Sequence, residues 1–254
     1  MNLREFGLNL EIQTKSDRCE SHGDYLSRNV FSNIWSGCPH CTAERQAVQQ
    51  QEAEERAASE RYREWKKRIG EAGIPERFHT RTLNSYIVTS EDQRRALEFS
   101  KAYTNNFENT GRSAIFCGRP GTGKTHLAVG IGLQLMESNK LVLFTTVQRM
   151  VRRVKDAWRT DNKESESDVI RLMVQPDLLI LDEIGVQFGT DFERNLMFDI
   201  LNERYEKCRS TILLSNQTVT EVKTLIGDRV FDRLREDGGQ CVPFNWESHR
   251  REKV

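Results

Sequence analysis

The sequence predicts an α/β fold in which helices cover both faces of a parallel sheet. Over residues 75–254, apolar runs typical of buried strands alternate with helix-like runs, and this alternation favours a parallel sheet. A glycine-rich loop at 118–125 joins one of these strands to a helix. Ahead of it, residues 1–42 are irregular in pattern and contain cysteines, and a charged segment follows over 43–74. We therefore expect a small N-terminal module, a helical linker and a large α/β domain.

The elements of the large domain follow from the spacing of apolar residues. Strands are expected over 113–117, 141–146, 178–182, 210–215 and 240–244. Helices are expected over 91–107, 124–137, 147–159, 165–174, 190–207 and 228–235. Strands separated by whole helices cannot form hairpins, so crossover connections between parallel strands are expected.

The loop after the first of these strands carries a phosphate-binding pattern. Residues 118–125 match G-x-x-x-x-G-K-[ST] in full, in the strand–loop–helix context that this pattern requires. Glycines let successive N–H groups turn inward, and the helix N-terminus adds positive potential. Lys124 is expected to reach the β- and γ-phosphates of ATP, and Thr125 to hold Mg²⁺. The predicted nucleotide-binding residues are Gly118, Arg119, Pro120, Gly121, Thr122, Gly123, Lys124, Thr125 and His126.

Two further strand ends supply candidate catalytic residues. One apolar run ends in Asp182 and Glu183, and the carboxyl ends of parallel strands carry functional side chains. We expect Asp182 to hold Mg²⁺ together with Thr125, and Glu183 to orient and deprotonate an attacking water. Asn216 follows the next strand and can bond the γ-phosphate or that water, although Ser-Asn after a strand also suits an ordinary turn.

The N-terminal module contains two ligand pairs for a metal. Cys19 and His22 form a C-x₂-H pair, and Cys38 and Cys41 form a C-x₂-C pair. Two such pairs suit the tetrahedral coordination of Zn²⁺. So short a segment has too small a core to fold by burial alone, so a zinc ion would supply the missing free energy. His40 is an alternative to His22, and unrelated cysteines on a flexible arm are the other interpretation.

Composition limits the possible partners and location. The 254 residues include 38 basic and 38 acidic side chains, so any nucleic-acid site must be a local patch. The sequence has no apolar run of membrane-spanning length and no apolar signal core at its N-terminus. We therefore expect a cytoplasmic protein, with no membrane partner and with reduced cysteines. The charged linker is expected as a long exposed helix, either a spacer or a partner-binding helix.

One expected helix, 147–159, is both amphipathic and basic. Its apolar stripe, which includes Trp158, is expected to face the core. Its basic residues are Arg149, Arg152, Arg153, Lys155 and Arg159. These cations suit the phosphates of nucleic acid, but a solvated helix face would carry the same pattern.

Arg229 and Arg233 lie one helical turn apart on the expected helix 228–235. An arginine donated into a neighbouring subunit's nucleotide site would stabilise transition-state charge and make hydrolysis depend on assembly. The alternative is a pair of salt bridges with Asp228, Asp232 or Glu236.

In this order and at these distances, the motifs resemble those of the AAA+ ATPases, and in particular the DnaC-type helicase loaders. The shared landmarks are 74–78, 118–125, 181–185, 215–216, 227–233 and 244–250. The resemblance implies an AAA+ core, Arg233 as a trans-acting arginine finger supported by Arg229, and Asn216 as the sensor. It also implies that the helix 147–159 binds single-stranded DNA. The sequence ends 21 residues after Arg233, so we expect no helical lid and a slow switch instead of a motor.

The N-terminal cysteine pairs depart from the DnaC pattern and look more like the zinc-bearing, helicase-binding end of DnaI-type loaders. The expected protein is therefore an ATP-dependent, prophage DnaC-like loader that binds a hexameric replicative helicase through residues 1–70, binds single-stranded DNA and self-associates through its AAA+ domain. Two alternatives remain: a helper ATPase of DNA transposition, and a nucleotide-gated adaptor with little hydrolysis. The cofactors expected are ATP, Mg²⁺ and Zn²⁺.

Overall fold

The computed structural model describes residues 13–31, 34–69, 73–108, 110–159, 164–185 and 190–249, without the side chains of 64–69. The chain divides into two compact units, Met1–Glu60 and Arg61–Val254. Within the described segments, no helix combines the length and the apolar character that a bilayer span needs.

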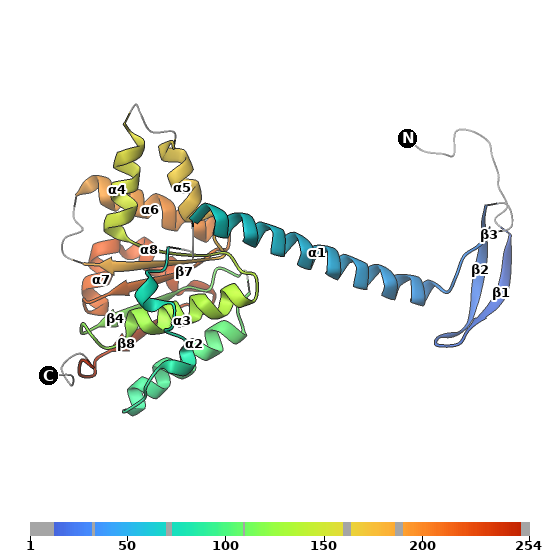
Figure 1. Cartoon of the computed structure of the whole chain (residues 1–254), viewed down its shortest axis with the longest axis horizontal. Helices are drawn as coiled ribbons and strands as arrows, with labels where there is room; N and C mark the ends of the chain where they lie inside the picture. Colours follow the sequence, from blue (N-terminus) through green and yellow to red (C-terminus); the bar gives the residue numbers. More distant parts are fainter. Residues whose placement is uncertain are drawn as a thin grey trace. The chain divides into compact units, whose positions relative to one another are not determined.

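The small unit is built on an antiparallel sheet of β1 (Thr14–Cys19), β2 (Gly23–Phe31) and β3 (Ile34–Trp35), in that order (Figure 1). The expectation of an irregular segment was therefore wrong for this part of the chain. The strand Thr14–Cys19 is TKSDRC, and because it is polar on both faces it shows no apolar alternation.

The predicted linker helix is confirmed as α1 (Pro39–Ile69). It starts before the predicted residue 43, with Pro39 as its first residue, where the missing N–H of proline costs nothing. Cys41 therefore lies in the first turn of the helix. The side chains of Trp65 and Ile69, near the end of this helix, lie outside the described residues.

The large unit contains a parallel sheet of five strands in the order β5-β6-β7-β4-β8. The strands are β4 (Ala114–Gly118), β5 (Val142–Thr146), β6 (Leu178–Ile184), β7 (Ser210–Ser215) and β8 (Gln240–Phe244). All five predicted strands are confirmed. The helices are η2 (Glu76–Phe78), η3 (Leu83–Ser85), α2 (Glu91–Asn105), α3 (Lys124–Glu137), α4 (Val147–Ala157), α5 (Glu166–Val174), α6 (Asp191–Glu206), α7 (Val219–Ile226), α8 (Asp228–Arg235) and η4 (Glu236–Gly238). The sequence pattern did not predict α7.

Two apolar layers bury the sheet. Ile115 and Cys117 of β4 pack into the layer formed with α4 to α8, whereas Ala114 and Phe116 pack into the layer formed with α2 and α3 (Figure 1). Successive strand residues point to opposite faces, so every strand between two covered faces must be apolar throughout. This explains the continuous apolar runs in the sequence.

One charged residue, Arg204 at the end of α6, is completely buried in the large unit. Its guanidinium donates to five acceptors: the carbonyls of Met173, Val174, Pro176 and Ser210 and the hydroxyl of Thr211. Burial lowers the pKa of Arg204 to about 9. The side chain therefore satisfies carbonyls at the C-terminus of α5, which have no partner within their own helix.

Candidate functional site

The phosphate-binding loop follows β4 at the carboxyl edge of the sheet. Gly118, Gly121 and Gly123 have φ values of 127°, 79° and 96°, in the region that favours glycine. Lys124 opens α3 and is only 6% exposed. Its Nζ donates to the carbonyls of Gly118 and Arg119 over 2.8 and 2.7 Å. The loop thus folds around a cationic group at the start of a helix, an arrangement suited to an anion.

The structure brings the two predicted magnesium ligands into contact. Thr125 Oγ1 donates to Asp182 Oδ2 over 2.9 Å, although 57 residues separate them in sequence. The other carboxylate oxygen of Asp182 accepts from the backbone N–H of Glu183 over 2.7 Å. Burial raises the pKa of Asp182, since the charged form is poorly solvated there. A hydroxyl and a carboxylate oxygen are ligands that Mg²⁺ accepts.

Glu183 lies at an irregularity in β6. The pairing of β6 with β7 shifts register between Leu181 and Ile184, and Glu183 has φ +63°. A non-glycine residue in this conformation is uncommon, and such backbone often occurs at functional sites. The bulge leaves Glu183 exposed beside the buried Leu181. Asn216, also exposed, follows β7 and lines the same cleft.

The cleft around these residues has a volume of about 340 Å³. Six predicted nucleotide-binding residues line it: Pro120, Gly121, Gly123, Lys124, Thr125 and His126. The ring of His126 is held by Nε2, which lies 2.9 Å from Thr82 O. Burial lowers the pKa of His126, which favours its neutral form. Arg77, Phe78 and Arg81 also line the cleft. For Arg77 and Phe78 the sequence signal was the landmark 74–78, to which no role had been given; Arg81 lies beyond that landmark and had no signal.

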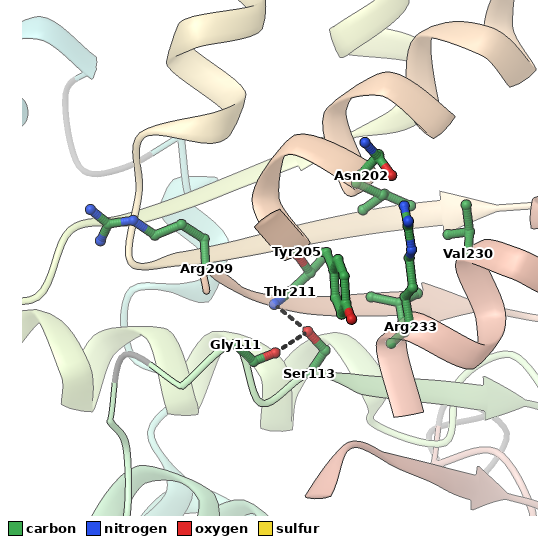
Figure 2. Close-up of a pocket in the computed structure, with 10 residues that line it drawn as sticks. Gly111, Ser113, Asn202, Tyr205, Arg209, Thr211, Val230 and Arg233 are labelled. Carbon is green, nitrogen blue, oxygen red and sulfur yellow. Dashed lines mark hydrogen bonds between the residues drawn. The ribbon is translucent and has the colours of Figure 1, made fainter. Parts of the chain in front are cut away.

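Arg229 and Arg233 do not line this cleft. Arg233 extends from α8 over the ring of Tyr205, with its guanidinium carbon 4.8 Å from the ring centroid, and lies beside Asn202 (Figure 2). Arg229 is exposed and lies 5.8 Å from the ring of Phe198. Among the described residues, neither arginine has a carboxylate within 4.0 Å, so the expected alternative of salt bridges receives no support.

In the small unit, the four predicted metal ligands lie together. The ligand atoms of Cys19, His22, Cys38 and Cys41 are all within 4.8 Å of one another. The Sγ atoms of Cys19 and Cys41 are 3.5 Å apart, and His22 Nδ1 lies 3.3 Å from Cys41 Sγ. The other ring nitrogen of His22 lies 3.1 Å from Glu44 Oε1, the kind of second contact that orients a histidine ligand. Such a set of three thiols and one imidazole fits tetrahedral Zn²⁺.

His40, the alternative ligand, does not belong to this group. Its ring stacks on that of His22 with 5.3 Å between the centroids. The helical start of α1 at Pro39 explains this, since it directs His40 and Cys41 to different sides of the first turn.

The expected apolar stripe of α4 is confirmed by the burial of Val147, Met150, Val151 and Val154. Trp158 was wrongly expected in the core. It is 53% exposed, lies edge-on to Phe192, and donates from Nε1 to Glu166 over 2.7 Å. A residue just after the last turn of a helix leaves the periodic pattern, so the stripe did not predict its position.

The basic residues of α4 differ in their surroundings. Arg153 forms a bidentate ion pair with Glu164, with both distances 2.7 Å. Arg152 and Lys155 line a second cleft, together with Glu183 and Asn216. The cationic face of α4 therefore adjoins the candidate catalytic residues.

Comparisons with known proteins agree with a nucleotide-binding site at the phosphate loop. The family model described as IstB-like ATP binding protein matches residues 44–253. The chain is 35% identical over 183 residues to the replicative helicase loader DnaC of Buchnera aphidicola subsp. Baizongia pistaciae (strain Bp), covering 72% of this chain and 74% of the relative. It is 36% identical over 179 residues to the replicative helicase loader DnaC of Escherichia coli (strain K12), covering 70% and 73%.

A crystal structure of the DnaC helicase loader superposes with a TM-score of 0.60 and 23% identity, covering 67% of this chain and 100% of that chain. At this identity the likeness shows the fold. The expected parallel-sheet AAA+ core is therefore confirmed.

Proposed function

We propose a function from one premise: the chain belongs to the IstB-like ATP-binding protein family and is homologous to curated DnaC replicative helicase loaders. The proposed function is ATP-dependent loading of a hexameric replicative helicase, in which ATP binding and hydrolysis switch helicase capture and release. The observation that carries it is the contact of Thr125 with Asp182, which joins the phosphate loop to the carboxylate strand. That contact assembles a site for a triphosphate and its cation.

In this proposal, Lys124 and the loop amides bind the β- and γ-phosphates, and Thr125 and Asp182 hold Mg²⁺. The cation would neutralise charge on the phosphate oxygens. Glu183 accepts a proton from the attacking water and orients it. Asn216, at the end of the neighbouring strand, donates to that water or to the γ-phosphate.

Arg233, supported by Arg229, acts on the nucleotide of a second copy of the chain. This assignment is supported by its place on α8, outside the cleft of its own chain. An arginine supplied by a neighbour makes hydrolysis depend on self-association. Turnover would then be slow in the isolated chain.

The small unit is proposed to bind zinc through Cys19, His22, Cys38 and Cys41 and to dock on the helicase. Its sheet exposes large apolar side chains that no described residue covers. Those residues are Leu26, Val30, Phe31 and Ile34, between 61% and 76% exposed. Exposed apolar side chains gathered on so small a unit suit a protein partner.

Single-stranded DNA is proposed to bind the cationic face of α4 through Arg149, Arg152 and Lys155, together with Arg159, which follows the helix because α4 ends at Ala157 and not at the predicted residue 159. Arg153 contributes less in this proposal, because Glu164 neutralises it within the chain. Phosphate binding of this kind weakens with salt.

The test of the proposed function is Glu183→Gln, which keeps the size of the side chain and removes the base. We expect ATP binding to persist and hydrolysis to fall by about a hundredfold. The variant should co-purify with the replicative helicase in ATP and fail to release it. Glu203→Gln is the matched control, since Glu203 pairs with Lys207 on α6.

Equal turnover by Glu183→Gln and the unaltered chain would favour the nucleotide-gated adaptor. Assembly on duplex DNA without any helicase contact would favour the helper ATPase of transposition. Either result would refute the loader mechanism.

A further inference from the structure

The landmark 244–250 has no role in the function proposed so far, yet its described residues, 244–249, lie against the phosphate loop. The N–H of Arg119 donates to Phe244 O over 3.0 Å, and the N–H of His249 donates to Gly121 O over 3.2 Å. Trp246 Nε1 donates to Thr122 O over 2.9 Å. We call residues 244–249 the C-terminal strap.

Close packing accompanies these hydrogen bonds. A Cβ atom on Gly121 would lie 2.0 Å from Ser248 Oγ, and one on Gly118 would lie 2.4 Å from Phe244 O. Glycine is therefore needed at Gly118 and Gly121 for two reasons: the positive φ angle at each position, and the close approach of the strap, which leaves no room for a Cβ atom. None of the strap residues lines the nucleotide cleft, so the strap contacts the loop from outside.

The carbonyl contacts determine where the loop amides point. In a trans peptide the C=O and the following N–H are directed oppositely, and the unit is planar. A donor that fixes Gly121 O therefore fixes the N–H of Thr122, and a donor that fixes Thr122 O fixes the N–H of Gly123. Both amides are directed away from the strap, which is the inward orientation that an anion-binding loop needs.

Two donors share the buried carbonyl of Thr122. Besides Trp246, Tyr86 donates from its hydroxyl over 3.2 Å, and burial raises the pKa of Tyr86 to about 12, so it keeps its proton. The strap itself is anchored. His249 Nε2 lies 3.1 Å from Gln93 Nε2 at the start of α2, and Trp246 packs on Phe244 with 4.8 Å between centroids.

We propose that the C-terminal strap orients the phosphate loop, with Trp246 as a positioning residue for nucleotide binding. Tyr86 is its partner on the same carbonyl. The strap acts by holding the peptide units of Gly121 and Thr122 with their carbonyls outward. This inference rests on nucleotide binding at the loop, as proposed above.

The experiment is calorimetric titration of the full chain with ADP and with ATP. Trp246→Phe keeps an aromatic ring and removes the indole donor, and Tyr86→Phe removes the second donor. We expect each single variant to raise both dissociation constants about threefold, and the double variant about thirtyfold, because the carbonyl is then buried without a partner. Both dissociation constants should rise, because the β-phosphate, which the loop amides bind in the proposed function, is present in ADP as well as in ATP.

Trp158→Phe is the matched control, because it also removes an indole donor, from Glu166, and should leave both constants within about twofold. If Trp246→Phe does not fold, Trp246→β-(3-benzothienyl)alanine keeps the shape of indole without its N–H. Unchanged constants in the double variant would overturn the role of the strap while leaving the proposed function intact. Absence of binding by the unaltered chain would instead refute the proposed function.

Discussion

Among its described residues, the small unit buries two side chains, Ser27 and Cys38. The large unit buries both faces of four strands, β4, β5, β6 and β7. The small unit also exposes Phe31, which is 76% exposed. A segment with so little buried surface cannot offset the entropy of ordering its chain by hydrophobic burial.

The difference separates two ways of building a binding site. In the large unit, packing holds β4, α3 and β6 in place, so Lys124, Thr125 and Asp182 are positioned whether or not a nucleotide is bound. In the small unit, the ligands themselves are the main contacts between the β1–β2 turn and the start of α1. Folding and zinc binding should there be a single event.

The largest expected effect is that of zinc removal, which should separate the stability of the small unit from that of the large unit. A chelator, or Cys38→Ser, is expected to unfold the small unit and leave the melting temperature of the large unit unchanged, because the large unit has its own core. Amide hydrogen exchange over β1 and β2, compared with β4 and β7, would measure this. Cys208→Ser is the control, because Cys208 is exposed and lies outside the cluster.

Retained protection of β1 and β2 in zinc-free protein would contradict this account. A protein purified without one equivalent of zinc, yet folded in both units, would do the same. The small unit would then need a source of stability other than its four ligands.

A substitution of Arg204 tests the opposite case, in which the large unit loses stability and the small unit is unaffected. Arg204→Ala leaves four carbonyls without their donor and opens a cavity beneath α6. We expect a loss of about 3–5 kcal/mol of stability, comparable to breaking a buried ion pair, and a fall of about 10 °C in melting temperature. Zinc content should stay unchanged.

The matched control is Arg194→Ala on the same helix. Arg194 pairs with Asp191 at the surface and is half exposed, so its removal should cost under about 1 kcal/mol. Equal losses from the two substitutions would show that Arg204 is dispensable to the core.

The same contrast explains which features the sequence could predict. The strands buried on both faces and the phosphate loop are local patterns, because such a strand has an apolar run at its centre and the loop needs glycines at fixed positions. The polar hairpin of β1 and β2 was missed, since no apolar layer determines its pattern. The short helix α7 was also missed; it buries only Val222 and Ile226.

Contacts between distant segments were the least predictable part of the site. The pairing of Thr125 with Asp182 could be expected, since Thr125 comes shortly after β4 and Asp182 lies near the carboxyl end of β6, at the same edge of the sheet. The contact of Ser248 with Gly121 depends on a segment without regular structure, and the lining of the cleft by Arg77 and Arg81 depends on the single turn of η2 and the residues after it. No periodicity signals where such segments lie.

The smallest expected effect concerns the zinc affinity of the small unit, and it tests whether α1 supports the metal site as well as supplying ligands. Glu44 contacts His22 from α1 over 3.1 Å without touching the thiols, so Glu44→Ala should lower zinc affinity about tenfold by releasing the ring of His22. A competition titration with a chromophoric chelator would measure the affinity. Glu52→Ala is the control, because Glu52 pairs with Arg56 on the same helix. Equal affinities for the two variants would mean that the thiols alone orient the metal site, and that α1 contributes ligands but no support.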